Sequence, residues 1–269
     1  MTTLIDTHCH IHEAAGTDDV AKRWHEAGIF DTAPLIQQAQ VAGVTRLLCV
    51  GCTPEDSRLA VGLAKEHDGV WAAIGIHPHE TKLYSERQSD IQRFADLARQ
   101  PKVVGIGECG LDYFYNHSPK ESQEKLLRFQ IELAQKHSLP MIFHVRDAFA
   151  DFWRIFDDYS DIRGVVHSFA AGEKELAEIL KRNLYVGLNG IMTFTKHVKQ
   201  LDAAKAVPIS KLLLETDAPF LTPQPLRGII NEPKNVRIIA EFLAELRGES
   251  LQELAENTTR NAQKLFGLS

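Results

Sequence analysis

Short apolar runs along this chain end at histidine or carboxylate side chains. Six such side chains are His8, His10, Glu108, His144, His167 and Asp217. In a parallel α/β barrel the carboxyl ends of all strands open on one face, so residues far apart in sequence meet there. Imidazole nitrogens and carboxylate oxygens are suitable ligands for Zn, Mn or Mg. The pattern therefore predicts a hydrolase site that binds two divalent metal ions and activates water.

The first apolar run supplies two of these histidines. His8 and His10 are separated by one residue, and side chains alternate along a strand, so both point to the same side and can bind one ion. His12 continues the alternation, so periodicity leaves open which two of the three bind. Nearness to the strand end favours His8 and His10.

Glu108 follows the run at residues 103–106 and has glycines at positions 107 and 110. Glycines let the backbone turn tightly, which suits a carboxylate that bridges two cations. The alternative is a structural Glu that caps the next helix. That helix is predicted to begin only near Ser118, so we favour the metal ligand.

The other three side chains each close a separate run. His144 or His167 taken alone is more typical of a buried histidine held by hydrogen bonds than of a ligand. Asp217 ends the last run, where a buried carboxylate is costly unless it is bound or hydrogen-bonded. Beside an activated water, Asp217 is the best candidate for the general base. The coincidence of six candidate ligands at strand ends favours a metal site.

Eight predicted strands, separated by helices, must position these residues. Apolar runs predict strands at residues 3–7, 44–50, 70–76, 103–107, 140–144, 164–167, 184–188 and 211–215. Helical patterns predict helices at 34–42, from 53, at 87–99, from 118, and at 147–158, 172–182, 196–206, 233–247 and 249–266, with a short one at 18–27. Continuously apolar strands that alternate with helices favour an α/β fold, a single-domain (β/α)8 TIM barrel over residues 1–269 with the site at the C-terminal ends of the strands.

The composition is that of an ordinary globular protein. The chain has 269 residues, of which 44% are hydrophobic and 25% charged, and a net charge of −6. No run of five basic residues occurs, which argues against an extended nucleic-acid-binding face, although metal ions could still supply charge for a phosphodiester. No apolar stretch approaches the roughly 18 residues of a membrane helix, and no signal peptide is recognisable. We expect a cytoplasmic protein with no membrane association and no obligate protein partner.

The four cysteines are Cys9, Cys49, Cys52 and Cys109. Cys49 and Cys52 have C-x-x-C spacing, but no second pair accompanies them, and Cys49 lies in an apolar run. We therefore expect reduced, buried thiols rather than a redox or zinc motif.

Seven motifs occur in order along the chain. They are Asp6-Thr7-His8-Cys9-His10, Gly75-Ile76-His77-Pro78-His79, Gly107-Glu108-Cys109-Gly110-Leu111-Asp112-Tyr113, His144-Val145-Arg146-Asp147-Ala148, His167-Ser168-Phe169, Glu215-Thr216-Asp217-Ala218-Pro219, and Arg227-Gly228 followed by Asn231-Glu232-Pro233. This series resembles the TatD-type metal-dependent hydrolases, the TatD-like deoxyribonuclease family of the amidohydrolase superfamily. The resemblance spans essentially the whole chain.

The resemblance implies a function and a division of the ligands. One metal would be held by His8, His10, Glu108 and Asp217, and Glu108 would bridge to a second metal held by His144 and His167. Asp217 and Glu108 would be the catalytic residues. The implied activity is metal-dependent cleavage of DNA, of the 3′-to-5′ exonuclease type, while some relatives resemble deacylases of aminoacyl-tRNA.

The chain departs from the family pattern in two places. Ile229 and Ile230 stand where relatives often have basic residues. Ala170 and Ala171 precede Gly172, where a glycine often follows the His-Ser-Phe motif more closely. The first departure removes positive charge near the expected site and leaves the identity of the substrate open.

Four residues are candidates for contacts with the substrate: His77, Arg146, Tyr113 and Arg227. His77 could contact substrate or a metal-bound water, whereas His79 could only brace its loop. Arg146 could bind a phosphate oxygen or instead form an ion pair with a neighbour. Tyr113 could stack on a base, but packing is the more common role. Glu215 is expected to orient neighbouring ligands.

Three classes of function fit this sequence. The first is a metal-dependent phosphodiesterase that acts on DNA. The second is a hydrolase with the same metals that cleaves an ester or amide, such as an aminoacyl ester. The third is a silent metal-binding scaffold, and the presence of both Glu108 and Asp217 counts against it.

Overall fold

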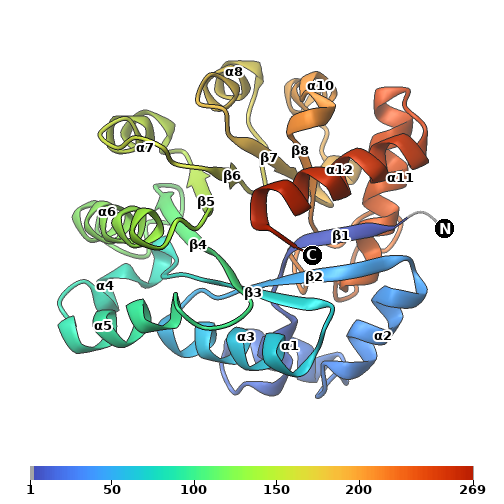
Figure 1. Ribbon diagram of the computed structural model, residues 1–269. Helices are drawn as coiled ribbons and strands as arrows, with labels where there is room; N and C mark the ends of the chain where they lie inside the picture. The colour runs from blue at the N-terminus through green and yellow to red at the C-terminus, as the bar shows by residue number, and fades with distance from the viewer. Residues whose placement is uncertain (1–2, 269) are drawn as a thin grey trace. The chain divides into compact units, whose positions relative to one another are not determined.

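The computed structural model describes residues 3–268, apart from the side chain of Gln88. Eight strands alternate with helices along the chain (Figure 1), which confirms the predicted α/β order. The described residues form two compact units: those up to Cys49 together with those from Ser168 onward, and Val50–His167. A single domain over residues 1–269 stays a prediction.

The first unit contains four strands, in two parallel pairs. Its strands are β1 (Leu4–Cys9), β2 (Val44–Val50), β7 (Tyr185–Leu188) and β8 (Leu212–Leu214), and its helices are α1 (Asp19–Glu26), α2 (Ala33–Val41), α8 (Glu173–Lys181), α9 (Ile191–Phe194), α10 (Val198–Ala206), α11 (Val236–Arg247) and α12 (Leu251–Phe266). β1 pairs with β2, and β7 pairs with β8. The last two helices pack against β1 and β8.

The second unit contains the other four strands, paired in chain order. Its strands are β3 (Val70–Ile74), β4 (Val103–Asp112), β5 (Met141–Arg146) and β6 (Gly164–Val166), and its helices are α3 (Pro54–Glu66), α4 (Thr81–Tyr84), α5 (Gln88–Leu97), α6 (Lys120–His137) and α7 (Phe149–Phe156). All three strand pairs are parallel. Short 3-10 turns complete both units, at Ile11–Ala15, Ile209–Lys211 and Pro233–Asn235 in the first and at Pro78–Glu80 in the second.

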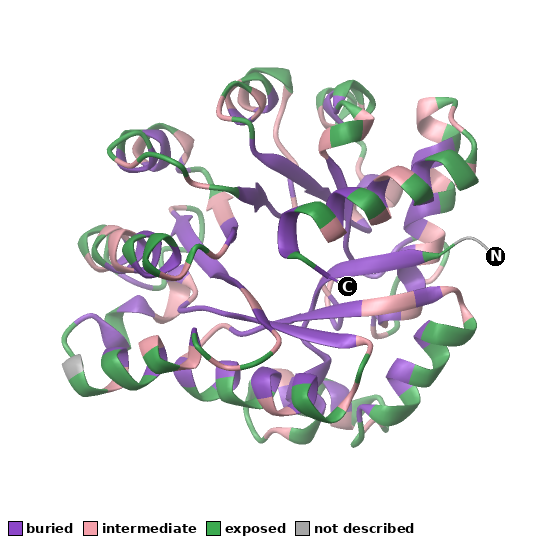
Figure 2. Cartoon of the chain, in the orientation of Figure 1, coloured by how far each residue is buried: buried purple, intermediate pink, exposed green. Residues whose placement is uncertain are grey.

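The strands are buried along most of their length, whereas the helices bury one side only (Figure 2). All six residues of β1 are buried, including polar ones, which is typical of parallel strands covered on both faces. No helix among residues 3–268 is long and apolar enough to cross a membrane. All four cysteines lie in the described part of the chain and are reduced thiols, and three of them are buried, as expected.

The largest departure from the predicted boundaries is at β4. The prediction ended the strand at residue 107, but the strand continues to Asp112. The predicted end was wrong because polar residues were taken to end the strand, whereas Glu108 and Asp112 are buried and remain part of it. Residues 109–112 pair with residues 143–146 of β5, so Glu108 lies within β4 rather than beyond its end.

Asn231 fixes the segment that follows β8 in the first unit. Its side chain is fully buried, and its Nδ2 donates to the carbonyl oxygens of Thr216 at 2.9 Å and Phe220 at 2.6 Å. Its Oδ1 accepts a hydrogen bond from Asn235 at 2.9 Å. The buried amide therefore holds the backbone on both sides of Asp217.

We predict that Asn231→Ala destabilises the protein by about 3 kcal/mol, since it leaves buried carbonyl groups without donors. For a domain of this size that corresponds to a fall in melting temperature of roughly 10 °C. Thermal unfolding followed by circular dichroism would measure it. The control is Asn257→Ala, which removes an exposed hydrogen bond within α12 and should cost less than about 0.5 kcal/mol. Equal melting temperatures for the two variants would contradict this role of Asn231.

Candidate metal centre

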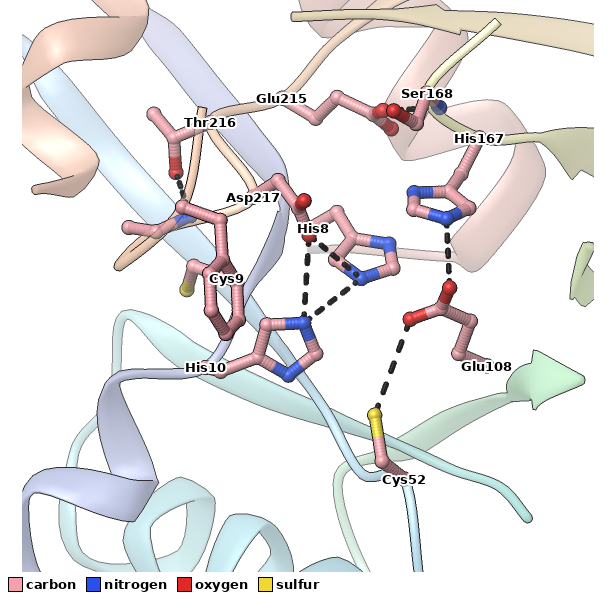
Figure 3. Close-up of polar contacts among 12 residues, drawn as sticks. His8, Cys9, His10, Cys52, Glu108, His167, Ser168, Glu215, Thr216 and Asp217 are labelled. Atoms are coloured by element: carbon pink, nitrogen blue, oxygen red, sulfur yellow. Dashed lines mark hydrogen bonds and ion pairs between the residues drawn. The ribbon is translucent and has the colours of Figure 1, made fainter. Parts of the chain in front are cut away.

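Three of the predicted ligands form a first cluster, in the unit that contains β1 and β8. His8 Nε2 lies 3.2 Å from His10 Nε2. Asp217 Oδ1 lies 3.6 Å from His8 Nε2 and 3.4 Å from His10 Nε2. Figure 3 shows both rings turned toward the Asp217 carboxylate. The three donor atoms thus form a nearly equilateral triangle.

Backbone pairing produces this cluster. The Asp217 amide donates to the carbonyl oxygen of His8 at 2.8 Å, and the His10 amide donates to that of Ala218 at 2.7 Å. The chain after β8 therefore runs beside the end of β1. Asp217 has φ +60°, a left-handed conformation that Asp tolerates better than most residues, so this turn is compatible with a carboxylate.

Asp6 forms hydrogen bonds with residues in and next to the first cluster. It is fully buried, and its carboxylate accepts hydrogen bonds from the amide of Thr216 at 2.9 Å and the amide of His8 at 3.2 Å. The Thr216 hydroxyl also donates to Asp6, at 2.5 Å. One carboxylate therefore links β1 to the residue that precedes Asp217. Asp6 belongs to the Asp6-Thr7-His8-Cys9-His10 motif, but residue type alone did not reveal this role.

The other predicted ligands form a second cluster, in the unit that contains β3 to β6. Glu108 Oε1 lies 2.7 Å from His144 Nδ1, 2.7 Å from His167 Nε2 and 3.3 Å from His77 Nε2. The His144 and His167 nitrogens are 3.4 Å apart. Cys52 Sγ lies 3.9 Å from the other oxygen, Glu108 Oε2 (Figure 3).

A close approach between β3 and β4 positions Glu108. A side chain on Gly75 would place its Cβ 2.3 Å from the carbonyl carbon of Gly107 and 2.4 Å from the amide nitrogen of Glu108. Only glycine therefore fits at position 75. On the other side, the Glu108 amide donates to the carbonyl oxygen of Gly51 at 3.1 Å.

The protonation states suit a cation. Burial alone would raise the pKa of Glu108, but the charges of His167 and His77 and hydrogen bonds from His144 and His167 hold that pKa well below its ordinary value. Burial lowers the pKa of His77 to about 4, against the opposing effect of Glu108. At neutral pH the second cluster therefore offers an ionised carboxylate and a neutral His77 imidazole.

Asp112, at the end of β4, contacts two histidines in or beside the second cluster, and residue type alone did not single it out. Its Oδ2 lies 3.0 Å from His144 Nε2 and 2.9 Å from His79 Nε2. Burial would raise the pKa of Asp112, but hydrogen bonds from His144 and His79 lower it far below its ordinary value. An ionised Asp112 can accept the Nε2–H of His144, which would leave the Nδ1 lone pair for a cation in place of the proton that His144 shares with Glu108. Strand alternation, which puts residues 108 and 112 on one side, could have revealed it.

We predict that Asp112→Asn weakens metal binding by about 10- to 100-fold, the usual effect of losing a carboxylate that orients a histidine ligand. An amide Nδ2 cannot accept the His144 proton, so the ring loses its fixed tautomer. Titration of chelator-stripped protein with Mn²⁺ would measure the change. An unchanged affinity would show that Asp112 does not orient His144.

The donor sets fit divalent cations. Two ligands at about 2.0–2.1 Å from a tetrahedral zinc ion are about 3.3 Å apart, and neighbouring ligands of an octahedral Mg²⁺ are about 2.9 Å apart. The first cluster has edges of 3.2, 3.4 and 3.6 Å, and Glu108, His144 and His167 have edges of 2.7, 2.7 and 3.4 Å. The donor atoms of His77, Glu108 and His144 also lie within 4.8 Å of one another.

His12 is grouped with other donors as well. It lies in the 3-10 turn after β1. One ring nitrogen of His12, one of His10 and one carboxylate oxygen of Glu13 all lie within 4.8 Å of one another, and the three residues are buried. The alternation that made His12 a third candidate therefore ends at the strand. His8 and His10 lie 3.6 and 3.4 Å from the Asp217 carboxylate.

Glu215 forms hydrogen bonds with Ser168 and Asn189, and its role in orienting ligands stays a prediction. Its Oε1 accepts the amide hydrogen of Ser168 at 2.5 Å and lies 3.4 Å from Asn189 Nδ2. Gly187 leaves room for this carboxylate, because a Cβ there would lie 2.3 Å from Glu215 Oε2.

The predicted substrate residues have varied surroundings. Arg146 is exposed and stacks on aromatic rings, with no ion pair to a carboxylate among residues 3–268. Lys120 Nζ lies 3.8 Å from the centre of the Tyr113 ring and covers one of its faces. Arg227 lies 4.1 Å above the Phe194 ring and donates to the carbonyl oxygen of Thr222 at 3.0 Å. Contact of these residues with substrate stays a prediction.

The chain resembles known proteins over almost its full length. Residues 5–267 match the family described as TatD related DNase. A Bacillus subtilis (strain 168) protein named uncharacterized metal-dependent hydrolase YabD is 35% identical over 268 residues, which are 99% of this chain and 100% of that protein. The 3′-5′ ssDNA/RNA exonuclease TatD of Citrobacter koseri is 35% identical over 89% of this chain and 94% of its own.

A solved structure confirms the fold class. The crystal structure of YJJV, a TatD homolog from Escherichia coli K12, matches with a TM-score of 0.84 and 28% identity, over 98% of each chain. The fold is therefore that of a (β/α)8 TIM barrel, as the sequence predicted. With the family match over residues 5–267, this chain belongs to the TatD-related metal-dependent hydrolases.

Proposed function

We propose that the protein is a metal-dependent exonuclease that removes nucleotides from the 3′ end of single-stranded DNA, and of RNA. The observation that carries the proposal is the Glu108 carboxylate with three imidazole nitrogens at 2.7 to 3.3 Å, a donor set that suits a cation. The name of the Citrobacter koseri relative, a 3′-5′ ssDNA/RNA exonuclease, supports the choice of substrate.

The proposed ligands are the six from the sequence analysis. In the first cluster they are His8, His10 and Asp217, and in the second Glu108, His144 and His167. Two divalent ions, Mg, Mn or Zn, are the proposed cofactors. When bound, such ions lower the pKa of a coordinated water and offset negative charge on the phosphate.

The side chains of the chain supply the proton transfers. Asp217 is 14% exposed, so it can reach a water molecule while its backbone stays anchored to His8. It accepts a proton from the attacking water as the new bond from oxygen to phosphorus forms. It then returns the proton to the 3′ oxygen as the old phosphodiester bond breaks. His77, neutral at pH 7, can orient a phosphate oxygen or the water.

Charge near the first cluster bears on phosphate binding. Arg23, an exposed residue of α1, lies 5.2 Å from the centre of the Phe220 ring, and that ring lies 6.3 Å from the His10 ring. Arg23 can therefore supply positive charge near the first cluster, in a chain that has Ile229 and Ile230 in place of basic residues. Such a contribution supports a phosphodiester substrate for this chain.

The test uses 5′-labelled single-stranded oligonucleotides with a free or a blocked 3′ end. The expected result with Mg²⁺ or Mn²⁺ is a ladder of products shortened one nucleotide at a time, absent for the blocked end and in EDTA. An aminoacyl ester is the comparison substrate. Hydrolysis of the ester without any cleavage of DNA or RNA would overturn the exonuclease proposal.

A further inference from the structure

Two aromatic rings are exposed immediately after β4. Phe114 is 55% exposed and Tyr115 is 50% exposed. The guanidinium carbon of Arg146, at the end of β5, lies 4.2 Å from the centre of the Phe114 ring and 4.6 Å from that of Tyr115. We propose that Phe114, Tyr115 and Arg146, here called the aromatic platform, bind one unpaired nucleotide of the substrate. This inference rests on the proposed function.

The platform is held in place although its rings are exposed. Asp112 Oδ1 accepts hydrogen bonds from the backbone amides of Phe114 at 3.0 Å and Tyr115 at 2.9 Å. The Asp112 backbone is itself fixed by the buried Gln123, which accepts from the Asp112 amide at 2.8 Å and donates to its carbonyl oxygen at 3.1 Å. A rigid ring loses little entropy when a base stacks on it.

The same carboxylate connects the platform to the second cluster. While Oδ1 of Asp112 holds the two platform amides, Oδ2 contacts His144 Nε2 at 3.0 Å. His144 is a proposed metal ligand and contacts Glu108 at 2.7 Å. One side chain therefore sets the position of both the platform and the ligand. A nucleotide held by the platform would be kept in a fixed position relative to the proposed metal ligands of this unit.

The chemistry of the platform selects a nucleotide. Exposed aromatic faces stack on any base, which suits an enzyme without sequence preference. A guanidinium stacked on a ring keeps its N–H groups at its edge, where they can bind a phosphate oxygen. Arg146 has no ion pair to a carboxylate within residues 3–268, so these groups are not neutralised by a neighbouring acid. Tyr115 also stacks on His117, at 5.7 Å and 9° between planes, which leaves Phe114 as the principal open ring.

The experiment measures binding of a fluorescent single-stranded hexanucleotide by anisotropy. The full chain carries Asp217→Asn to prevent turnover and is loaded with Mn²⁺. We expect Phe114→Ala with Tyr115→Ala to weaken binding by about 5- to 150-fold, the range for losing one stacked base. Phe114→Leu with Tyr115→Leu, which keeps apolar bulk, should be nearly as weak. Tyr115→Phe, which keeps the ring, should bind as tightly as the parent, which is the Asp217→Asn chain with an unaltered platform.

A series of oligonucleotides, each with one abasic position, locates the stacked base. One position should weaken binding to the parent by the same factor as the double alanine change, and the two effects should not add. Arg146→Ala should weaken binding to all oligonucleotides and reduce the salt dependence by about one counterion. Unaltered melting temperatures confirm that the exposed changes leave the fold intact.

The outcomes separate this inference from the proposed function. Cleavage of DNA by the chain with Asp217 intact, together with unchanged binding in the platform variants, would overturn the platform and leave the exonuclease in place. The platform would also be overturned if the loss of binding from every abasic position added fully to the loss from the double alanine change. Absence of both binding and cleavage with Phe114 and Tyr115 intact would overturn the platform and the proposed function together.

Discussion

Asp217→Asn is expected to lower the rate of hydrolysis by about 10²- to 10⁴-fold, the usual contribution of a general base. The amide has nearly the same size and can keep the backbone bond to His8, but it cannot accept a proton from water. The loss should appear in kcat, with a smaller change in KM. Initial rates at saturating Mn²⁺ and oligonucleotide would measure it.

Asp202→Asn provides a matched control, since Asp202 is exposed on α10 in the same unit. The control variant should keep the rate of the unaltered chain. If Asp217→Asn retained more than about a tenth of the rate at saturating metal, a base contribution of the usual size would be excluded. Another residue would then have to accept the proton.

Glu108→Gln is expected to weaken metal binding by about 100-fold or more, since losing a residue that only orients a ligand already costs 10- to 100-fold. The carboxylate is 6% exposed and contacts His144, His167 and His77, so the change to glutamine removes the negative charge that these three rings face. Activity should fall with occupancy, and excess metal should restore part of it. Isothermal titration with Mn²⁺ would give the affinity.

Glu121→Gln is the control for this change, because Glu121 is exposed in the first turn of α6. It should bind metal as the unaltered chain does. Equal affinities for both variants would remove Glu108 from the ligand set, whatever the effect on activity. Loss of binding with unchanged secondary structure by circular dichroism would support its role as a ligand.

Helix starts could be predicted from the sequence where a nearby side chain forms a hydrogen bond with the first turn. Asp18 accepts the amide hydrogen of Ala21 and Thr53 that of Asp56, so α1 and α3 begin within one residue of the starts predicted at 18 and 53. The continuation of β4 to Asp112 was not predictable by polarity, because its buried carboxylates depend on partners from other strands. Those partners become neighbours only in the folded unit.

The candidate site shows the same division. Residue type and strand position were sufficient to select His8, His10 and Glu108, since donor chemistry is a property of each side chain. The role of Asp112 depends on contacts with His79, in the 3-10 turn that follows β3, and with His144 of β5. Likewise the sequence analysis considered stacking only for Tyr113 and favoured packing there, whereas its neighbours Phe114 and Tyr115 are the exposed rings. Which aromatic residue faces solvent is decided by the loop conformation that Asp112 imposes.

The most direct test of the account combines metal content and activity in one titration. Chelator-stripped protein is titrated with Mn²⁺ while bound metal and shortening of a 5′-labelled single-stranded oligonucleotide are measured on the same samples. We expect no hydrolysis without metal, and activity that reaches its maximum at two ions per chain. Full activity in the stripped protein, or no hydrolysis with two ions bound, would contradict it.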